Sequence, residues 1–196
     1  MEYQYFPLVL EGYQVILFDT SIKHALASSE YNTRRKECEQ GVALVKAKYP
    51  TVTSLRDASI EMLNESIDFQ THPIVYNRCK YVIEEITRTQ NACVDLQANN
   101  LEAFGQKMFE THQGLSKLYE VSCPELDFLV EHAKNNEAVI GARMMGGGFG
   151  GCTINIIQSQ KATQMIDDIS KAYEQATGKQ LKHYIVRIED GAGTLS

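Results

Sequence analysis

A glycine-rich run between two apolar segments is the feature that most constrains this chain. It reads Gly-Ala-Arg-Met-Met-Gly-Gly-Gly-Phe-Gly-Gly-Cys-Thr over residues 141–153. Residues 137–145 before it and 152–157 after it are rich in strand-favouring apolar side chains, which predicts two strands. Because most positions from 146 to 151 lack a Cβ, the backbone there can adopt positive φ and lie close to another segment. We therefore expect a strand–loop–strand unit whose loop approaches something else closely.

The glycine loop has a structural and a functional interpretation. It is either a turn where two backbones pack closely, or a loop that approaches phosphates, or supports the loop that does, with main-chain N–H groups directed toward an anion. A turn rarely needs so many glycines, which favours function. Gly146, Gly148 and Gly151 formally match G-x-G-x-x-G, but a dinucleotide site requires a helix after the glycines and here a strand follows. A protein kinase is also excluded, because H-R-D, D-F-G and V-A-I-K do not occur.

The remaining periodicities predict a mainly helical chain around a small sheet. Two β-favouring runs, 3–10 and 13–18, are separated by Glu11-Gly12 and predict a hairpin. Ser122-Cys-Pro-Glu125 predicts a capping box at the start of a helix. A last strand is expected at 181–188, and helices are expected over residues 32–49, 59–65, 73–97, 101–119, 123–135 and 161–177. This order predicts an α+β fold, an antiparallel sheet with helices packed mainly on one face.

The composition excludes several classes of function. The 196 residues carry a net charge of −6, which argues against a nucleic-acid or anionic-membrane surface as the main partner. No apolar run approaches the ~18 residues of a membrane span. The five cysteines are odd in number, widely spaced and without C-x-x-C, and the histidines are scattered, so we expect neither a disulfide framework nor a metal site. A reducing, cytoplasmic location fits best.

Several arginines lie on the predicted helices. Arg34 and Arg35 fall in a first turn, where positive charge opposes the helix dipole, and we leave open whether they are solvated or belong to a site. Arg78, Lys80 and Arg88 lie opposite the apolar face of the 73–97 helix. We interpret these three as a solvated surface.

Residues 141–153 resemble the C-terminal motif of the GHMP small-molecule kinases, in the form typical of galactokinases. Three further stretches resemble galactokinase segments in the same order along the chain, so the resemblance covers essentially all 196 residues. These stretches are Ser29-Glu-Tyr-Asn-Thr-Arg-Arg-Lys-Glu-Cys38, Arg78-Cys-Lys-Tyr-Val-Ile-Glu-Glu-Ile-Thr-Arg88 and Tyr119-Glu-Val-Ser-Cys-Pro-Glu-Leu-Asp127.

The resemblance implies a GHMP kinase C-terminal domain with ferredoxin-like elements, and ATP- and Mg²⁺-dependent phosphorylation of α-D-galactose at its anomeric hydroxyl. Tyr31 matches the family's sugar-contacting tyrosine; without the resemblance it reads as an apolar residue packed on the following helix. The family's glycine motif helps to shape the cleft next to the phosphate loop, and it is matched by Gly146, Gly147, Gly148, Gly150 and Gly151. Met145 and Gly147 stand where threonine and alanine are common, and neither change removes a backbone donor.

Other parts of the family pattern do not occur in this sequence. They are the catalytic arginine with its sugar-contacting run, the Pro-x-Gly-x-Gly-Leu-Ser-Ser-Ser-like phosphate loop, and the catalytic aspartate; Asp19 and Asp57 match no such context. We therefore assign no catalytic and no metal-binding residue, and expect most ATP and Mg²⁺ contacts on an N-terminal domain. Met1 begins almost inside a β-favouring run, which also suggests a preceding segment.

We expect residues 1–30 to be the end of an N-terminal domain sheet with its connection, and residues 31–196 to be the C-terminal domain. The chain alone should be inactive, and should dimerise or aggregate through an apolar patch along residues 3–18. Galactose and the N-terminal domain are the expected partners. Two alternatives remain. One is a non-catalytic sugar and ATP sensor on the same scaffold. The other is a helical interaction domain with a structural glycine hairpin.

Overall fold

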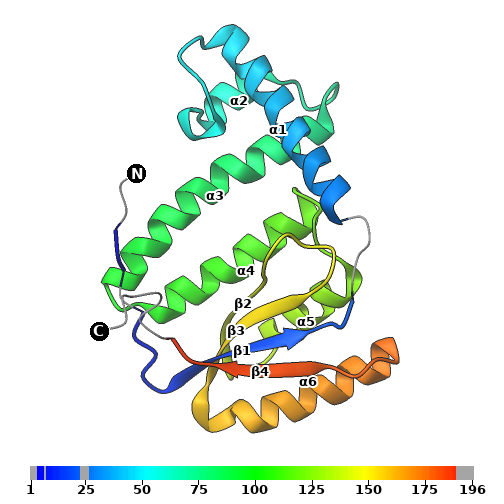
Figure 1. Cartoon of the computed structure of the whole chain (residues 1–196). Coiled ribbons are helices and arrows are strands. Elements are labelled where there is room, and N and C mark those ends of the chain that lie inside the picture. The colour runs from blue at the N-terminus through cyan, green and yellow to red at the C-terminus, as the bar shows by residue number, and fades with distance from the viewer. Residues whose placement is uncertain (1–3, 7, 23–26, 189–196) are drawn as a thin grey trace, which may run out of the picture.

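The computed structural model describes residues 4–6, 8–22 and 27–188. Proline begins two of the helices at the first helical position, where its missing N–H costs no hydrogen bond. In chain order the elements are β1 (Tyr13–Asp19), α1 (Ala27–Lys48), η1 (Leu55–Asp57), α2 (Ile60–Ser66), α3 (Pro73–Gln97), α4 (Leu101–Lys117), α5 (Pro124–Lys134), β2 (Val139–Met144), β3 (Cys152–Gln158), η2 (Ser159–Lys161), α6 (Ala162–Thr177) and β4 (Lys182–Val186). Figure 1 shows α1, α2 and one end of α3 standing away from the sheet as a helical arm.

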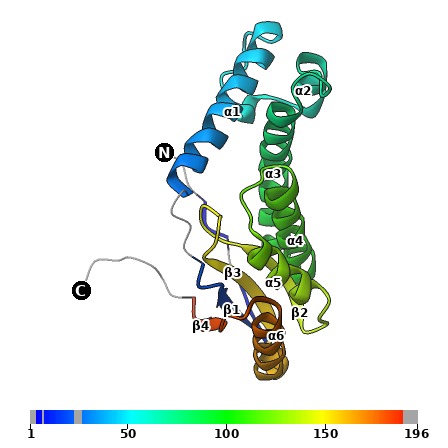
Figure 2. The same ribbon diagram turned by 90° about the vertical axis from the view of Figure 1, so that its right-hand side faces the viewer.

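The four strands form one antiparallel sheet in the order β2-β3-β1-β4. The helices gather mainly on one side of it, as the view in Figure 2 makes clear. The predicted α+β architecture is therefore confirmed. In the described part of the chain, no helix is both long and apolar enough to cross a bilayer.

The main core lies between the sheet and helices α5 and α6. Ile16 and Phe18 point from β1 into this core and are fully buried. They meet apolar side chains that recur at helical spacing, which explains why these two helices cover this face. The helical residues of this core are Leu129, Val130, Ala133, Ala162, Met165, Ile166, Ile169 and Tyr173. A separate core holds the helical arm together where α1, α2 and α3 meet.

Helix α4 crosses β2 so closely that the two backbones are in contact at Gly105 and Gly141. A Cβ added to Gly105 of α4 would lie 2.1 Å from the carbonyl oxygen of Ile140, and one added to Gly141 would lie 2.5 Å from Cα of Gly105. Real side chains do not tolerate such contacts, so both positions require glycine. Helix α3 then packs on α4, so this crossing sets the distance of the helical layer from the sheet.

The predicted hairpin between residues 3–10 and 13–18 is wrong. Residues 4–6 and 8–10 form no strand, and β1 pairs instead with β3 on one side and β4 on the other. β-branched and aromatic residues favour a strand, but the neighbours of β1 come from the other end of the chain. β1 precedes the domain boundary expected near residue 30, yet it pairs with two strands that follow that boundary. The boundary itself stays a prediction about a longer protein.

Two further sequence expectations need correction. The capping box at residues 122–125 does not form: the helix is capped at Cys123 without a side-chain bond, and the Ser122 hydroxyl donates to Asp127 instead. The arginines of α3 are not solvated, since Arg78 is 2% exposed and Arg88 makes ion pairs with Glu85 and Glu110. Acceptors from other elements offset the burial of these charges.

Candidate functional site

The glycine loop joins β2 to β3 and is anchored on two sides. On one side the Phe149 amide donates to the carbonyl oxygen of Val121 at 2.7 Å. On the other side the Gly151 amide donates to the carbonyl of Ile22 at 3.2 Å, and the Thr20 amide and hydroxyl both donate to the Gly151 carbonyl at 3.0 and 2.8 Å. The loop is thus tied both to the segment after α4 and to the segment after β1, and in Figures 1 and 2 it lies beside the N-terminal end of α1.

The glycines of the loop are not equivalent. Gly148 has a φ of +87°, and a Cβ there would lie 2.0 Å from the carbonyl oxygen of Val121. Gly150 has a φ of +133° and meets the carbonyl oxygen of Ile22 in the same way, at 2.6 Å. At Gly147, by contrast, φ is not in the left-handed region and a Cβ would meet nothing within 4 Å. Contacts inside the chain therefore explain Gly148 and Gly150, but they do not explain Gly147.

The segment that receives the loop, residues 118–121, offers its carbonyl groups to several donors. Glu120 adopts a φ of +52°, unusual for a residue with a side chain. The Leu118 carbonyl accepts from Arg78, the carbonyls of Tyr119 and Glu120 accept from Arg34, and the Val121 carbonyl accepts from the Phe149 amide. In each case the carbonyl oxygen is the acceptor. The segment is thereby held from the helical arm on one side and holds the glycine loop on the other.

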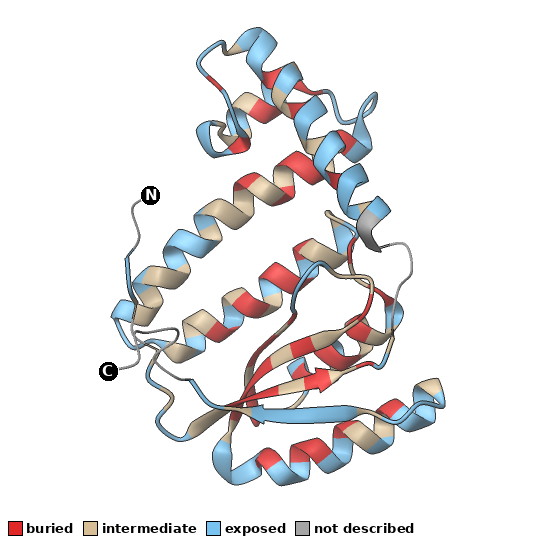
Figure 3. Cartoon of the chain, in the orientation of Figure 1, coloured by how far each residue is buried: buried red, intermediate tan, exposed pale blue. Residues whose placement is uncertain are grey.

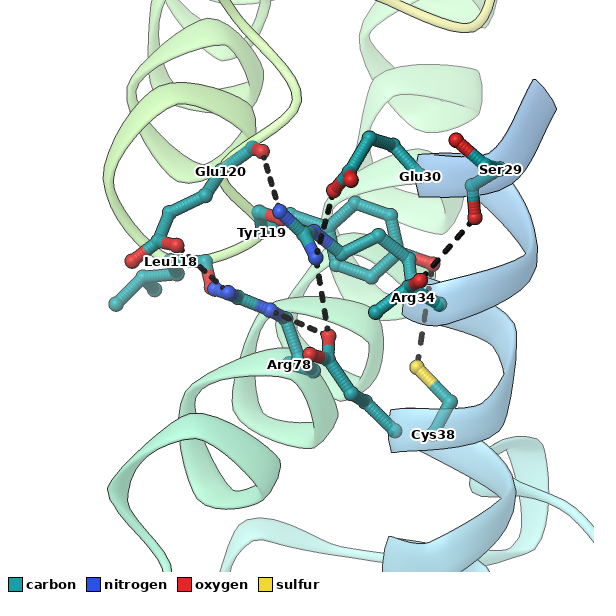
Figure 4. A network of polar contacts seen from close by, with 10 residues as sticks. Ser29, Glu30, Arg34, Cys38, Arg78, Leu118, Tyr119 and Glu120 are labelled. Carbon is teal, nitrogen blue, oxygen red and sulfur yellow. Dashed lines mark hydrogen bonds and ion pairs between the residues drawn. The ribbon is translucent and has the colours of Figure 1, made fainter. Parts of the chain in front are cut away.

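Two buried arginines form the centre of this contact (Figure 4). Arg34 of α1 donates from Nε to the Tyr119 carbonyl at 2.7 Å and from a terminal nitrogen to the Glu120 carbonyl at 3.0 Å. Arg78 of α3 donates to the carboxylates of Glu37 at 3.0 Å and Glu120 at 2.7 Å. Glu37 also lies 3.4 Å from Arg34, so one carboxylate serves both guanidinium groups. Each buried charge is paired, which its burial requires.

Comparisons with known proteins agree with this geometry. A family model described as GHMP kinases C terminal matches residues 92–175, which include α4, α5 and the glycine loop. Residues 92–175 thus carry the GHMP kinase C-terminal domain that this model describes. The chain is 38% identical over 192 residues to a galactokinase of Clostridium acetobutylicum, covering 98% of this chain and 49% of that protein. A galactokinase of Thermotoga neapolitana is 36% identical over 97% of this chain and 52% of its own length. The chain thus spans about half the length of the curated relatives it matches.

Solved structures extend the comparison of this GHMP kinase domain. A Lactococcus lactis galactokinase in complex with galactose superposes with a TM-score of 0.89 at 30% identity, over 96% of this chain and 48% of that one. An L. major mevalonate kinase in complex with R-mevalonate gives a TM-score of 0.51 at 20% identity, over 89% of this chain and 43% of that one. The second likeness concerns the fold alone.

Tyr31 lies in the N-terminal half of α1, and it is 61% exposed. The staple interpretation, in which it packs on its own helix as an apolar residue, is not favoured by this exposure. Tyr31 is close enough to Tyr119 to affect its titration: burial is the largest cause of the raised pKa of the Tyr119 hydroxyl, and Tyr31 adds to it. The candidate sugar contact therefore lies near the 118–121 segment that holds the glycine loop.

His112 and Asp127 form a polar cluster that the sequence did not single out. The Met144 amide donates to Nδ1 of His112 at 3.1 Å, and Nε2 of His112 lies 3.2 Å from Asp127. Burial raises the pKa of the Asp127 carboxyl, but contacts with His112 and with the hydroxyls of Ser122 and Ser116 outweigh it and lower the pKa to about 2. The cluster links α4 and α5 to the end of β2, next to the glycine loop.

The GHMP kinase domain contains no group of three or more His, Cys, Asp or Glu side chains that fits a metal ion, within the residues that the structure describes. Two loop amides, those of Phe149 and Gly151, are engaged inside the chain. These two amides are not available to bind phosphate, so the arrangement fits a loop that packs against a neighbouring segment better than one that directs all its N–H groups to phosphates.

Proposed function

We propose that this chain is the C-terminal half of a galactokinase, which transfers the γ-phosphoryl group of ATP to the anomeric hydroxyl of α-D-galactose. The observation that carries the proposal is the similarity to galactokinases over 97–98% of the chain at 36–38% identity. The superposition on a galactose-bound galactokinase supports it. A cytoplasmic location belongs to the same proposal and is supported by five free cysteines.

Within that enzyme, the chain forms one wall of the cleft. Tyr31 contacts the sugar, and the glycine loop of residues 146–151 braces the phosphate-binding loop of an N-terminal domain from across the cleft. The open space beside Gly147 supports this role, because a Cβ there would meet nothing within 4 Å and the loop surface is free for another segment to pack on. ATP and Mg²⁺ are held mainly by the N-terminal domain, because this sequence lacks the family's phosphate-loop pattern and catalytic aspartate context.

The isolated chain is catalytically inactive in this proposal. Phosphoryl transfer depends on a phosphate cradle, a metal ion and a group that orients the attacking hydroxyl. The sequence contains neither the phosphate-loop pattern nor the catalytic aspartate context of the family. The same absence leaves part of its surface without its natural partner. Of the expected apolar patch, Ile16 and Phe18 are buried within the chain, whereas Tyr5 and Val9 are exposed and are the residues through which the chain would self-associate.

The test compares the 196-residue chain with the full-length protein that contains it. ATP-dependent phosphorylation of galactose is followed by a coupled assay of ADP release, with glucose as the control sugar. We expect turnover by the full-length protein and none by the chain. Turnover by the chain alone would refute the proposal that the catalytic residues lie on the N-terminal domain. A full-length protein that binds galactose and ATP without turnover would identify the alternative, a non-catalytic sensor on the same scaffold.

A further inference from the structure

We infer that Arg34 is a positioning residue that aligns the Tyr31-bearing part of α1 with the glycine loop, and thereby places the sugar and the nucleotide relative to each other. Neither ligand needs to touch Arg34. The inference rests on the proposed function, because it takes Tyr31 as a sugar contact and the loop as the border of the nucleotide site. It adds a role for a residue that no catalytic motif contains.

Three consecutive carbonyl groups, at residues 119–121, connect Arg34 to the glycine loop. The carbonyls of Tyr119 and Glu120 accept hydrogen bonds from the guanidinium group of Arg34, at 2.7 and 3.0 Å. The next carbonyl, that of Val121, accepts from the Phe149 amide at 2.7 Å and lies against Gly148. One short piece of backbone therefore connects α1 directly to the glycine loop. A shift at either end is transmitted through two peptide units.

The N-terminal half of α1 has few buried residues that could hold it in place. Between Ser29 and Glu39, Arg34 is the only buried residue, with 8% of its surface exposed. The apolar contacts of α1 begin at Cys38, one turn after Arg34, and continue along the helix to Val45 in the core of the arm. Arg34 is therefore the main anchor of this half of the helix. Tyr31, one turn earlier, is placed by that anchor.

Glu37 and Arg78 hold the Arg34 side chain in place. Glu37, one turn later on α1, lies 3.4 Å from Arg34 and accepts from Arg78 of α3 at 3.0 Å. Arg78 also binds the Leu118 carbonyl and the Glu120 carboxylate, so the segment is gripped from two helices (Figure 4). A planar guanidinium with several donors can hold two adjacent carbonyls at once, and a lysine ammonium cannot reproduce that fork. Arg34→Lys keeps the charge and removes the alignment.

The experiment uses the full-length protein with Arg34→Lys. Its matched control is Arg88→Lys, since the Arg88 side chain is similarly buried, 16% exposed against 10% for Arg34, and pairs with Glu85 and Glu110 away from the glycine loop. The dissociation constants for galactose and for a non-hydrolysable ATP analogue are measured separately and together, alongside kcat and both KM values. Circular dichroism and the unfolding midpoint report the folded fraction.

We expect Arg34→Lys to lower kcat about ten- to a hundredfold per folded molecule, because small misplacements of reacting groups have effects of that size. Each ligand measured alone should bind within about threefold of wild type, and the factor by which one ligand changes the affinity for the other should move toward one. Arg88→Lys should leave all of these values within about twofold. A merely structural role would lower the folded fraction and leave kcat per folded molecule unchanged, and that result would overturn the inference.

Two further outcomes separate this inference from the proposed function. A wild-type protein that binds neither galactose nor the analogue refutes the proposed function and the inference with it. A wild-type enzyme that is active while Arg34→Lys retains wild-type kcat refutes the inference alone. If Arg34→Lys does not fold, Glu120→Gln decides, because that exposed side chain can be changed without burying a new group and the neutral amide weakens one contact of Arg78 with the segment. The same loss of kcat, at least threefold, is then required.

Discussion

Gly148→Ala tests how the glycine loop is held, and its effect can be worked out from the structure. The new Cβ would lie 2.0 Å from the carbonyl oxygen of Val121 and 2.9 Å from its carbon, so the backbone must move. A φ of +87° costs a residue with a side chain about 1–2 kcal/mol. Movement of the loop also loses the bond from the Phe149 amide to Val121, worth about 1 kcal/mol. We expect a loss of about 2–3 kcal/mol in the free energy of unfolding.

Two neighbouring glycines provide controls that separate these contributions. Gly151 has a φ of +81° but open space around a Cβ, so Gly151→Ala should show the conformational cost alone, about 1–2 kcal/mol. Gly147 has neither constraint, so Gly147→Ala should change stability by less than about 0.5 kcal/mol. Urea and thermal unfolding of the 196-residue chain measure the series. Gly148→Ala should lower Tm by about 5–10 °C. Equal losses for Gly148→Ala and Gly151→Ala would refute the claim that contact with Val121 constrains the loop.

Two further predictions concern the sugar contact and the His112 cluster. In the full-length protein, Tyr31→Phe should raise the KM for galactose about tenfold through loss of one sugar hydrogen bond, and an unchanged KM would remove Tyr31 from the site. The pKa of Asp127 is lowered to about 2 from an ordinary 3.8, so its contribution to stability is present above pH 4 and lost as the pH falls from 4 toward 2. Because the side chain is 36% exposed, we expect only about 1 kcal/mol, measured as a flatter acid limb of the stability–pH curve in Asp127→Asn.

The sequence predicted the helices of this domain well, because their signals are local. Helix α3 runs from Pro73 to Gln97 as expected, since proline sets its start and the apolar residues recur at helical spacing. The glycine loop was also recognised, with β2 and β3 on its flanks. The strand predicted at residues 3–10 was wrong because strand propensity does not identify the pairing partner. β1 pairs instead with residues 152–158 and 182–186.

The burial of Arg34 and Arg78 could not be predicted for a related physical reason. The acceptors of Arg34 are main-chain carbonyls 85 and 86 residues away, and a carbonyl has no signature in the sequence. Arg78 looked solvated because it lies opposite the apolar face of α3, where the loop after α4 covers it. Pairs of side chains can be anticipated from spacing, whereas contacts from side chain to distant backbone appear only with the fold.

The crossing of Gly105 and Gly141 has a consequence for how the domain reaches its shape. Helix α4 contains Gly105 and Gly114, each of which weakens a helix by about 1 kcal/mol relative to alanine, so α4 depends on docking for its stability. Helix α4 packs on β2 through buried residues (Figure 3), and α3 packs on α4, so the direction of the arm follows from that of α4. The orientation of α1 relative to the glycine loop therefore depends on the contact between Gly105 and Gly141, which lies in another part of the molecule. A substitution there would displace the N-terminal part of α1, with the candidate sugar contact Tyr31, relative to the glycine loop without changing either of them.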